Sequence, residues 1–384
     1  MPASPALIAA WARSAVAPHG GAFRSLHAHE IGAPVLQALL QRAGLPAEAV
    51  DAMVLGNALG AGGNPARMLA LAAGLPERCA ALSVDTQCCA GLDAVSMAVG
   101  LLASGQASVV VAGGVEAWSR APIRHIRPLH AHEQPVAYER PPFAPDPARD
   151  PDLLQSAADY ASQHGISRAV QDAYAVHSHQ QAMQHQTTLA TEIVPVQGLL
   201  HDAYPRALSP ERAARMPLAL KGAVADACSL STLAVSPKAD GAALVLLATP
   251  EACAQWGLKP RADWVASASV GGDSCAPMLS AQTAALAAMQ RAGVGSAQSL
   301  HAVELHDAFA VQGLAFCAAL GLAPEHINRR GGGLARGHPI GASGAIALVR
   351  VLADLAHNGV AGARGLAAVA GAGGIGAAAV VERL

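Results

Sequence analysis

LSVDTQCCAGLDAVSMAVGLLASG, residues 82–105, carries the strongest fold signal of this chain. The strand-like run Leu82-Ser83-Val84 comes first, and a helical pattern that ends at Gly105 follows. Its apolar residues, at positions 92, 95, 99 and 102, define one face of a helix. Cys88 stands at the predicted helix start, where free N–H groups and the helix dipole favour an anion. We therefore expect a lowered pKa and a nucleophilic thiolate. A buried structural cysteine is the alternative interpretation.

A second stretch repeats this arrangement. His338-Pro339-Ile340-Gly341-Ala342-Ser343-Gly344 precedes a helical pattern that ends at Asn358-Gly359, a typical C-terminal cap. The strand-like runs 109–112 and 366–370 follow the two helices, and each ends in glycines. The alternation predicts two related α/β halves with mostly parallel strands covered by helices. We expect the two helix starts to meet at one site.

The region between the halves has a different composition. Residues 121–152 are rich in Pro, His, Arg and Asp without a clear period, which predicts a long surface loop. Residues 156–184 form a helical run in which Ser167 is a predicted N-cap, and residues 195–237 are irregular. We interpret residues 118–234 as an insertion folded over the first half as a substrate lid.

Composition limits the function classes. The chain has 384 residues and a formal net charge of −2, so we expect neither nucleic acid nor an anionic membrane as partner. Seven cysteines without metal-ligand spacing favour free thiols in a reducing compartment, and 16 scattered histidines favour surface solvation over a metal site. Residues 1–12 do not read as a signal peptide, nor residues 366–381 as a membrane helix. We expect a cytoplasmic protein without a metal.

Seven segments in order resemble the thiolase family. They lie at residues 13–21, 56–67, 88–92, 109–119, 166–175, 236–243 and 337–344. Cys88 to Leu92 is similar to the family's nucleophile motif Cys-x-Ser-Gly-Leu, with Ala90 for Ser, and Gly337 to Gly344 is its histidine motif unchanged. The resemblance implies an α/β fold of duplicated βαβαβ halves, with a five-layered α-β-α-β-α core and an inserted loop domain. The implied divisions are residues 1–117 with about 235–256, the insertion 118–234, and the second half 257–384.

The resemblance also implies an acyltransferase that uses coenzyme A thioesters. Cys88 would take the acyl group as a thioester, and His338 would activate the thiol. The backbone N–H groups of Cys88 and Ala372 would bind the oxyanion of the attacked carbonyl. Ser236, Ala308 and Phe309 would line the coenzyme A tunnel. No tightly bound cofactor is implied, and a homodimer or tetramer is the family's usual assembly.

The second half departs from the usual family pattern at two places. Residues 303–309 read VELHDAF, so His306 stands where an asparagine is usual, as in the sterol-carrier-protein-like branch. It would stabilise an enolate oxygen. The second, acid/base cysteine is missing, because Ala370 occupies its usual position and Ala308 its position in that branch. Alanine cannot accept a proton.

Three functions therefore stay open. The first is a thiolase-like acyltransferase with Claisen or retro-Claisen chemistry, in which a histidine or water takes over the proton transfer. The second is a decarboxylating ketoacyl-synthase-like or C-acylating condensing enzyme, with a site made of Cys88, His338 and His306. The third is a degenerate, non-catalytic acyl-CoA-binding subunit, although the retained motifs weigh against it. Cys89 is a candidate substitute for the missing thiol, but adjacent residues at a helix start point in different directions.

Overall fold

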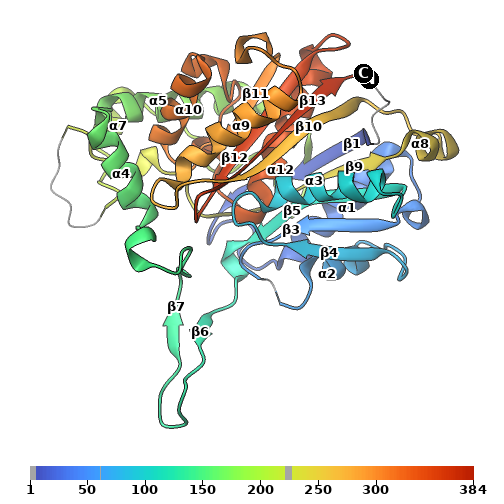
Figure 1. Cartoon of the computed structure of the whole chain (residues 1–384), viewed down its shortest axis with the longest axis horizontal. Coiled ribbons are helices and arrows are strands. Elements are labelled where there is room, and N and C mark those ends of the chain that lie inside the picture. Colours follow the sequence, from blue (N-terminus) through green and yellow to red (C-terminus); the bar gives the residue numbers. More distant parts are fainter. Residues whose placement is uncertain (1–5, 61, 221–226) are drawn as a thin grey trace.

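Two sheets and three layers of helices make up the core (Figure 1), and the computed structural model describes residues 6–60, 62–220 and 227–384. The strands of the first sheet are β1 (Leu7–Ser14), β3 (Ala52–Gly56), β4 (Ala80–Val84), β5 (Val109–Ala117) and β9 (Ala239–Ala248). Those of the second are β10 (Ala262–Gly271), β11 (Ala302–His306), β12 (Arg364–Gly371) and β13 (Ile375–Arg383). Two short strands, β2 (Ala17–Pro18) and β8 (Ile193–Val194), pair with β9 and β1.

The two sheets repeat one topology. The order is β4-β3-β5-β9-β1 in the first sheet and β11-β12-β13-β10 in the second, and a short antiparallel pairing of β1 with β10 joins them. β3-β5 and β11-β12 are parallel pairs, whereas β5-β9, β9-β1, β12-β13 and β13-β10 are antiparallel. The predicted duplication of an α/β unit is confirmed, although each sheet is more antiparallel than the sequence pattern indicated.

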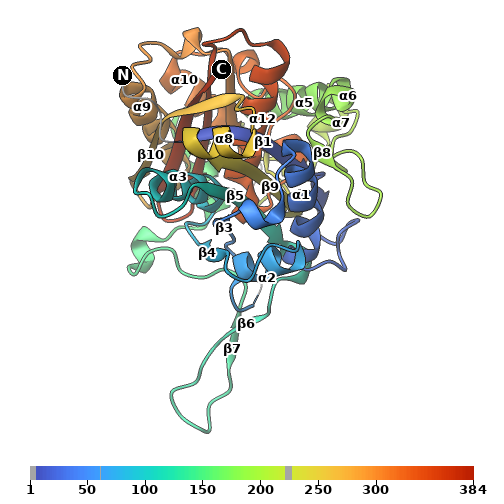
Figure 2. The same ribbon diagram turned by 90° about the vertical axis from the view of Figure 1, so that its right-hand side faces the viewer.

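Helices cover both sheets and fill the space between them. The helices of the halves are α1 (Ala28–Ala43), α2 (Pro65–Ala72), α3 (Ala90–Ala103), α8 (Pro250–Trp256), α9 (Ser280–Arg291), α10 (Ala310–Leu320), α11 (Gly333–Arg336) and α12 (Ile340–Asn358). α3 and α12 pack together between the sheets, α1 and α2 cover the first sheet, and α9 with α10 cover the second (Figures 1 and 2). α12 is long and apolar enough to cross a membrane, but 83% of its apolar window is buried in this core.

Glycines allow the starts of α3 and α12 to meet. A Cβ added to Gly91 in α3 would lie 2.6 Å from the carbonyl oxygen of Gly341 in α12, and one on Gly114 of β5 would lie 1.9 Å from the same oxygen. A side chain at either position would hold the two halves apart. β5 continues through Gly113 and Gly114 to Ala117, whereas the sequence pattern predicted that the strand ends at these two glycines.

Within its described residues, 118–220 and 227–234, the insertion carries a projecting hairpin and four α-helices. β6 (Arg124–Ile126) and β7 (Val136–Tyr138) form a ribbon that extends from the body in Figures 1 and 2. The helices are α4 (Leu153–Gln163), α5 (Arg168–Gln184), α6 (Gln186–Leu189) and α7 (Pro210–Ala214). The predicted single helical run is thus two helices, separated at Gly165, where φ is 62°. Ser167 caps α5 as predicted, its side chain accepting from Val170 N.

Two helices of the insertion, α4 and α5, lie over the second half. α5 contacts α10 and α11, and α4 also contacts α10 (Figure 1). The predicted placement over the first half is therefore wrong for these helices, because their apolar faces pack on the second half rather than on α1 or α2. Buried residues of α5 join a cluster with Phe316 and Leu320, and those of α4 join Met278 and Val311. The predicted surface loop 121–152 also contains the β6-β7 ribbon.

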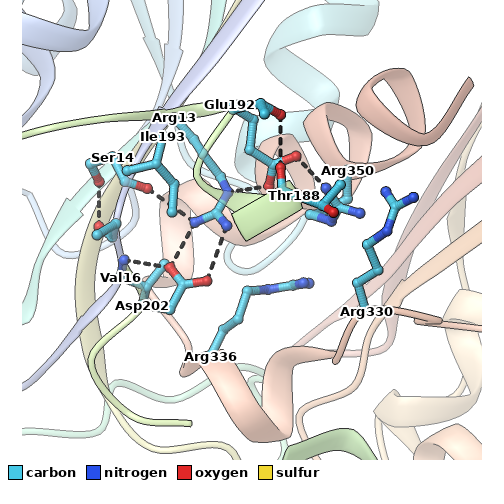
Figure 3. A network of polar contacts seen from close by, with 12 residues as sticks. Arg13, Ser14, Val16, Thr188, Glu192, Ile193, Asp202, Arg330, Arg336 and Arg350 are labelled. Atoms are coloured by element: carbon cyan, nitrogen blue, oxygen red, sulfur yellow. Dashed lines mark hydrogen bonds and ion pairs between the residues drawn. The ribbon is translucent and has the colours of Figure 1, made fainter. Parts of the chain in front are cut away.

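Buried ion pairs join the insertion to both halves (Figure 3). Glu192, just before β8, accepts from Arg13 of β1 at 2.6 Å and also pairs with Arg350 of α12. Arg13 makes a second pair with Asp202 at 2.7 Å, and Arg350 one with Asp354 at 2.5 Å. Each of these side chains is at most 7% exposed. The sequence pattern did not indicate this network, since Arg13, Glu192 and Arg350 are far apart in the chain.

His179 of α5 makes acid stability testable. Its ring is buried against Tyr204, and within the described residues neither ring nitrogen has a hydrogen-bond partner. Burial lowers the pKa of His179 from 6.5 to about 4, and the nearby Arg206 charge acts in the same direction. Between pH 4 and pH 6.5, His179 therefore binds a proton in the unfolded chain but not in the folded chain. The contribution of His179 to stability is therefore full above pH 6.5 and is lost as the pH falls towards 4.

The free energy of unfolding falls between pH 7 and pH 5. We expect this fall to be about 2 kcal/mol smaller in His179→Met than in the wild type. Urea unfolding at the two pH values measures the difference. The exposed His132→Met is the control and should leave the loss unchanged. Equal losses in the wild type and in His179→Met would contradict the assignment.

Candidate active site

Cys88 lies in a tight turn between β4 and α3. Gln87, the residue before it, has a φ of 53°, a backbone conformation that non-glycine residues adopt rarely. Cys89 is the N-cap of α3, and its backbone N donates to Thr86 O at 3.1 Å. The turn leaves Cys88 half-buried at the helix start. Its Sγ lies 3.1 Å from Nε2 of His338, as the repeat predicted that the two helix starts would meet.

His338 occupies the corresponding turn before α12. Its backbone N donates to Pro237 O at 2.7 Å, and its Nδ1 lies 2.7 Å from Ser343 Oγ. The Ser343 hydroxyl donates to Pro339 O at 3.0 Å. Because the Ser343 proton is directed to Pro339, Ser343 accepts from the Nδ1–H of His338. The lone pair of Nε2 therefore faces the Cys88 thiol.

The thiol and the imidazole are both neutral at pH 7. Burial raises the pKa of the Cys88 thiol to about 12, and the backbone N–H groups of Ala372 and Cys88 oppose this only in part. Burial lowers the pKa of His338 to about 4. The predicted lowering of the Cys88 pKa is thus wrong, because loss of water outweighs the helix terminus. The 3.1 Å contact is short enough for a proton to pass between Sγ and Nε2.

Two backbone donors lie beside the thiol. Ala372 belongs to the turn between β12 and β13, and its N–H is close enough to the Cys88 sulfur to lower its pKa, as is the N–H of Cys88 itself. Gly373 and Gly374 complete the turn, each with a φ of 82°. The second half thus contributes one donor and the first half the other. Negative charge that develops near the sulfur would be stabilised by both.

His306 completes a group of three side chains. It ends β11 and is 4% exposed, and its ring stacks on that of His338 with 4.2 Å between the centroids. Its Nε2 has no hydrogen-bond partner among the described residues. Burial lowers the pKa of His306 well below its ordinary value, and its neighbours His338 and Arg336 act in the same direction. The ring is therefore neutral and keeps a nitrogen available for a ligand.

Ser236, Ala308 and Phe309 lie together beside this group. Ser236 N donates to Ala308 O at 2.9 Å, and an isolated β-bridge pairs Val235 with Phe309. The hydroxyl of Ser236 donates to Gly333 O at 2.6 Å. The structure thus gathers the three residues into one wall. Ala308 and Phe309 follow His306 closely in the chain, and Ser236 joins them to α11.

The site contains a buried carboxylate that the motif analysis did not single out. Glu116 of β5 accepts hydrogen bonds from Asn57 Nδ2 at 2.8 Å, Ala58 N at 2.9 Å and Gly341 N at 3.0 Å. Burial raises its pKa to about 7. Glu116 holds the loop after β3 against the start of α12, and so supports the turn that carries His338. The sequence feature that could have indicated Glu116 is that it is the single charged residue in the apolar run 109–117.

Cys89, the candidate substitute for the missing acid/base thiol, does not face the Cys88–His338 pair. Cys89 Sγ faces the carbonyl oxygens of Val369 at 3.6 Å and Ile375 at 3.8 Å, beneath the β12-β13 hairpin. It is buried there, whereas Cys88 faces His338. Ala370 pairs with Gly376 in the same hairpin. Within the described part of the chain, no group of three or more His, Cys, Asp or Glu side chains could hold a metal ion.

The chain is similar to known proteins over nearly its whole length. Residues 6–251 match the family model of the thiolase N-terminal domain, and residues 258–383 that of the thiolase C-terminal domain. An acetyl-CoA acetyltransferase of Rhizobium meliloti is 36% identical over 98% of this chain and 98% of its own length. One from Shinella zoogloeoides is 35% identical over 99% and 100%.

Solved structures give the same result. An acetyl-CoA acetyltransferase of Bacillus anthracis superposes with a TM-score of 0.88 and 29% identity, over 99% of this chain and 98% of that one. The Acat5 thiolase of Ascaris suum, solved in complex with coenzyme A, superposes with a TM-score of 0.89 and 28% identity, over 99% and 100%. With both of its halves matched by sequence and by structure, this chain belongs to the thiolase family.

Proposed function

We propose that this protein is a thiolase-type acyltransferase in which Cys88 takes the acyl group of an acyl-CoA and a Claisen or retro-Claisen step then makes or breaks a C–C bond. The observation that carries the proposal is the 3.1 Å contact between the Cys88 sulfur and the unprotonated nitrogen of His338. The names of the relatives and the coenzyme A bound by the Ascaris suum neighbour support coenzyme A thioesters as substrates.

The acyl-transfer step follows from this contact. Cys88 Sγ attacks the thioester carbonyl while its proton passes to His338 Nε2. The N–H groups of Cys88 and Ala372 donate to the carbonyl oxygen as it gains charge. The bond between the carbonyl carbon and the coenzyme A sulfur then breaks, and the leaving thiolate takes the proton from His338. Coenzyme A leaves as a thiol and the enzyme holds an acyl-Cys88 thioester.

The C–C step uses both histidines. Once Cys88 is acylated, Nε2 of His338 has its lone pair free and takes the α-proton of a second acyl-CoA. His306 Nε2–H donates to the enolate oxygen, which its partner-free position permits. The enolate carbon attacks the acyl-Cys88 carbonyl, the Cys88 thiolate leaves, and it recovers the proton from His338. This sequence needs no thiol at Ala370 or Ala308.

A second candidate is a decarboxylating condensation. Two stacked histidines beside the nucleophile, with alanine at both positions of the acid/base thiol, favour a donor that becomes an enolate without losing an α-proton. A malonyl thioester does this when its carboxylate leaves as carbon dioxide and the electron pair of that C–C bond becomes the enolate.

Intact-mass analysis and product assays test these functions. One sample of the protein is mixed with acetyl-CoA alone. A second sample is first acylated with an acyl-CoA and is then mixed with malonyl-CoA. Acetylation of Cys88 and thiolysis of acetoacetyl-CoA are expected for the proposed function. Product formed only from malonyl-CoA would favour the decarboxylating alternative. Absence of any acyl-enzyme would contradict both and leave a non-catalytic acyl-CoA-binding subunit.

His306→Ala is expected to slow the C–C step by about 10²- to 10³-fold, because the enolate oxygen loses a buried donor. Acylation of Cys88 should change little, since His338 keeps its contacts with Cys88 and Ser343. Thiolysis of acetoacetyl-CoA and the rate of acylation by acetyl-CoA measure the two steps. The exposed His326→Ala is the control. Equal losses in both steps would contradict this role.

The remaining assignments are also proposals. We propose the division into residues 1–117 with about 235–256, the insertion 118–234 and the second half 257–384; the return of β9 to the first sheet supports it. The wall of Ser236, Ala308 and Phe309 is proposed to contact coenzyme A.

We further propose a cytoplasmic homodimer, with a tetramer as the alternative. β4 ends the strand order of the first sheet, and most of its residues are exposed, so its edge is open to a second copy. Light scattering of the purified protein measures the assembly, and a monomer at all concentrations would contradict it.

A further inference from the structure

Asp307, the residue after His306, is buried and shared by two segments. Its Oδ2 accepts a hydrogen bond from Tyr174 OH at 3.0 Å. Its Oδ1 accepts from the backbone N–H groups of Gly333 and Leu334 in α11. The carboxyl group is fully buried, so these contacts replace the water that it loses on folding. Asp307 therefore ties Tyr174 to the Gly333 peptide.

The Gly333 peptide forms a surface on which the His306 ring rests. A Cβ added to Gly333 would lie 2.7 Å from Cε1 and 2.8 Å from Nδ1 of His306. The other side of the peptide is held as well, since Gly333 O accepts from Ser236 Oγ at 2.6 Å. The position of this peptide thus limits where the ring of His306 can lie, and Asp307 limits the position of the peptide.

Tyr174 reaches this place from the insertion. It lies on α5 and is 7% exposed, and Gly313 of α10 makes room for it: a Cβ there would lie 2.3 Å from the Tyr174 hydroxyl oxygen. Burial raises the pKa of Tyr174 well above its ordinary value, and the Asp307 charge adds to this. The hydroxyl therefore remains protonated and donates to Asp307 throughout the neutral range.

We propose that Tyr174 is a positioning residue for the C–C step: its hydroxyl fixes Asp307, Asp307 fixes the Gly333 peptide, and this peptide holds His306 against the enolate. The inference rests on the proposed function, because it assigns His306 to that step. Through its buried hydroxyl, Tyr174 would connect helix α5 of the insertion to the C–C step. The acylation step does not depend on it, because Ser343 and Glu116 hold His338 and its turn from the other side.

Tyr174→Phe tests the inference, since it removes only the hydroxyl. We expect kcat for thiolysis of acetoacetyl-CoA to fall by about 10- to 100-fold, because a small displacement of a catalytic group has effects of this size. The rate of Cys88 acylation by acetyl-CoA should stay within about 2-fold of wild type. The matched control is Tyr160→Phe, on α4, whose ring stacks on His164 and which has no contact with Asp307 among its described interactions.

Two further variants separate positioning from a structural role. Tyr174→Phe combined with His306→Ala should be no slower in thiolysis than His306→Ala alone, because the two residues act through one ring. Gly333→Ala places a methyl group against His306 without removing any hydrogen bond of Tyr174, and it should also slow thiolysis while sparing acylation. This variant keeps the test valid if Tyr174→Phe folds poorly.

The outcomes are distinct. Wild type that forms no acyl-Cys88, or acylates without thiolysis, overturns the proposed function and this inference with it. Active wild type with an unchanged Tyr174→Phe overturns the inference alone. Tyr174→Phe that loses acylation and thiolysis equally, or that adds its full loss to that of His306→Ala, also overturns it and leaves Tyr174 a structural residue.

Discussion

Cys88→Ala is expected to abolish acyl transfer, with a loss of turnover of about 10⁴- to 10⁶-fold, because both steps pass through the Cys88 thioester. The variant should show no mass increase with acetyl-CoA and no thiolysis of acetoacetyl-CoA. Cys88 has few structural contacts to lose, since it is half-buried and its described side-chain hydrogen bond goes to His338. The thermal midpoint should therefore change little.

Cys89→Ala is the matched control. Its thiol is adjacent in sequence but faces the carbonyl oxygens of Val369 and Ile375. The variant should keep acylation of Cys88 and most of its turnover, at a modest cost in stability. Acetylation of the Cys88→Ala protein at Cys89, or loss of turnover in Cys89→Ala alone, would show that the nucleophile has been assigned to the wrong residue.

Glu192→Gln is expected to lower the free energy of unfolding by about 3–5 kcal/mol. The substitution keeps the shape of the side chain but removes the charge that Arg13 and Arg350 share, and both guanidinium groups are fully buried (Figure 3). Arg13 keeps Asp202 and Arg350 keeps Asp354, which Arg330 shares, so the buried cluster is left with three positive charges against two carboxylates. One desolvated charge then lacks compensation, and this costs more than the pair contributes. Urea unfolding at pH 7 measures the change.

Glu139→Gln controls for the loss of one negative charge. Glu139 is 93% exposed and lies 3.5 Å from Lys238, which is itself 55% exposed. A pair in water contributes little, so this variant should remain within about 0.5 kcal/mol of wild type. Similar effects of the two substitutions would mean that the buried network does not join the insertion to the two halves in the way described.

The reactive residues could be predicted because their signals are local. A helix start needs only the spacing of a few apolar residues around Cys88, and the same holds for His338. The duplication then indicated that these two would meet, and they do, at 3.1 Å. Ser343 lies inside the same motif, but the sequence did not indicate its role. That role depends on the Ser343 hydroxyl proton, which is donated to Pro339 O and so leaves the hydroxyl oxygen free to accept from His338.

Burial decided the electrostatics, and sequence does not report burial. The helix start predicted a lowered pKa for Cys88, whereas enclosure by both halves raises it to about 12 and lowers that of His338 to about 4. The result is a neutral pair in place of a preformed thiolate, and in the proposed mechanism its proton moves during attack. The same limit applies to Glu116, whose carboxyl group accepts from backbone N–H groups of the loop after β3 and of the first turn of α12.

The duplicated α/β fold, the two turns that carry Cys88 and His338, and the absence of a thiol at Ala370 and Ala308 could all be read from the sequence. Each of these is a property of a short segment or of its repeat. Folding in three dimensions was needed to place α4 and α5 over the second half, to bring Tyr174 to Asp307 beside His306, and to let Glu192 join both halves. These contacts join residues that are more than 100 positions apart, and no periodicity along the chain specifies which of them meet.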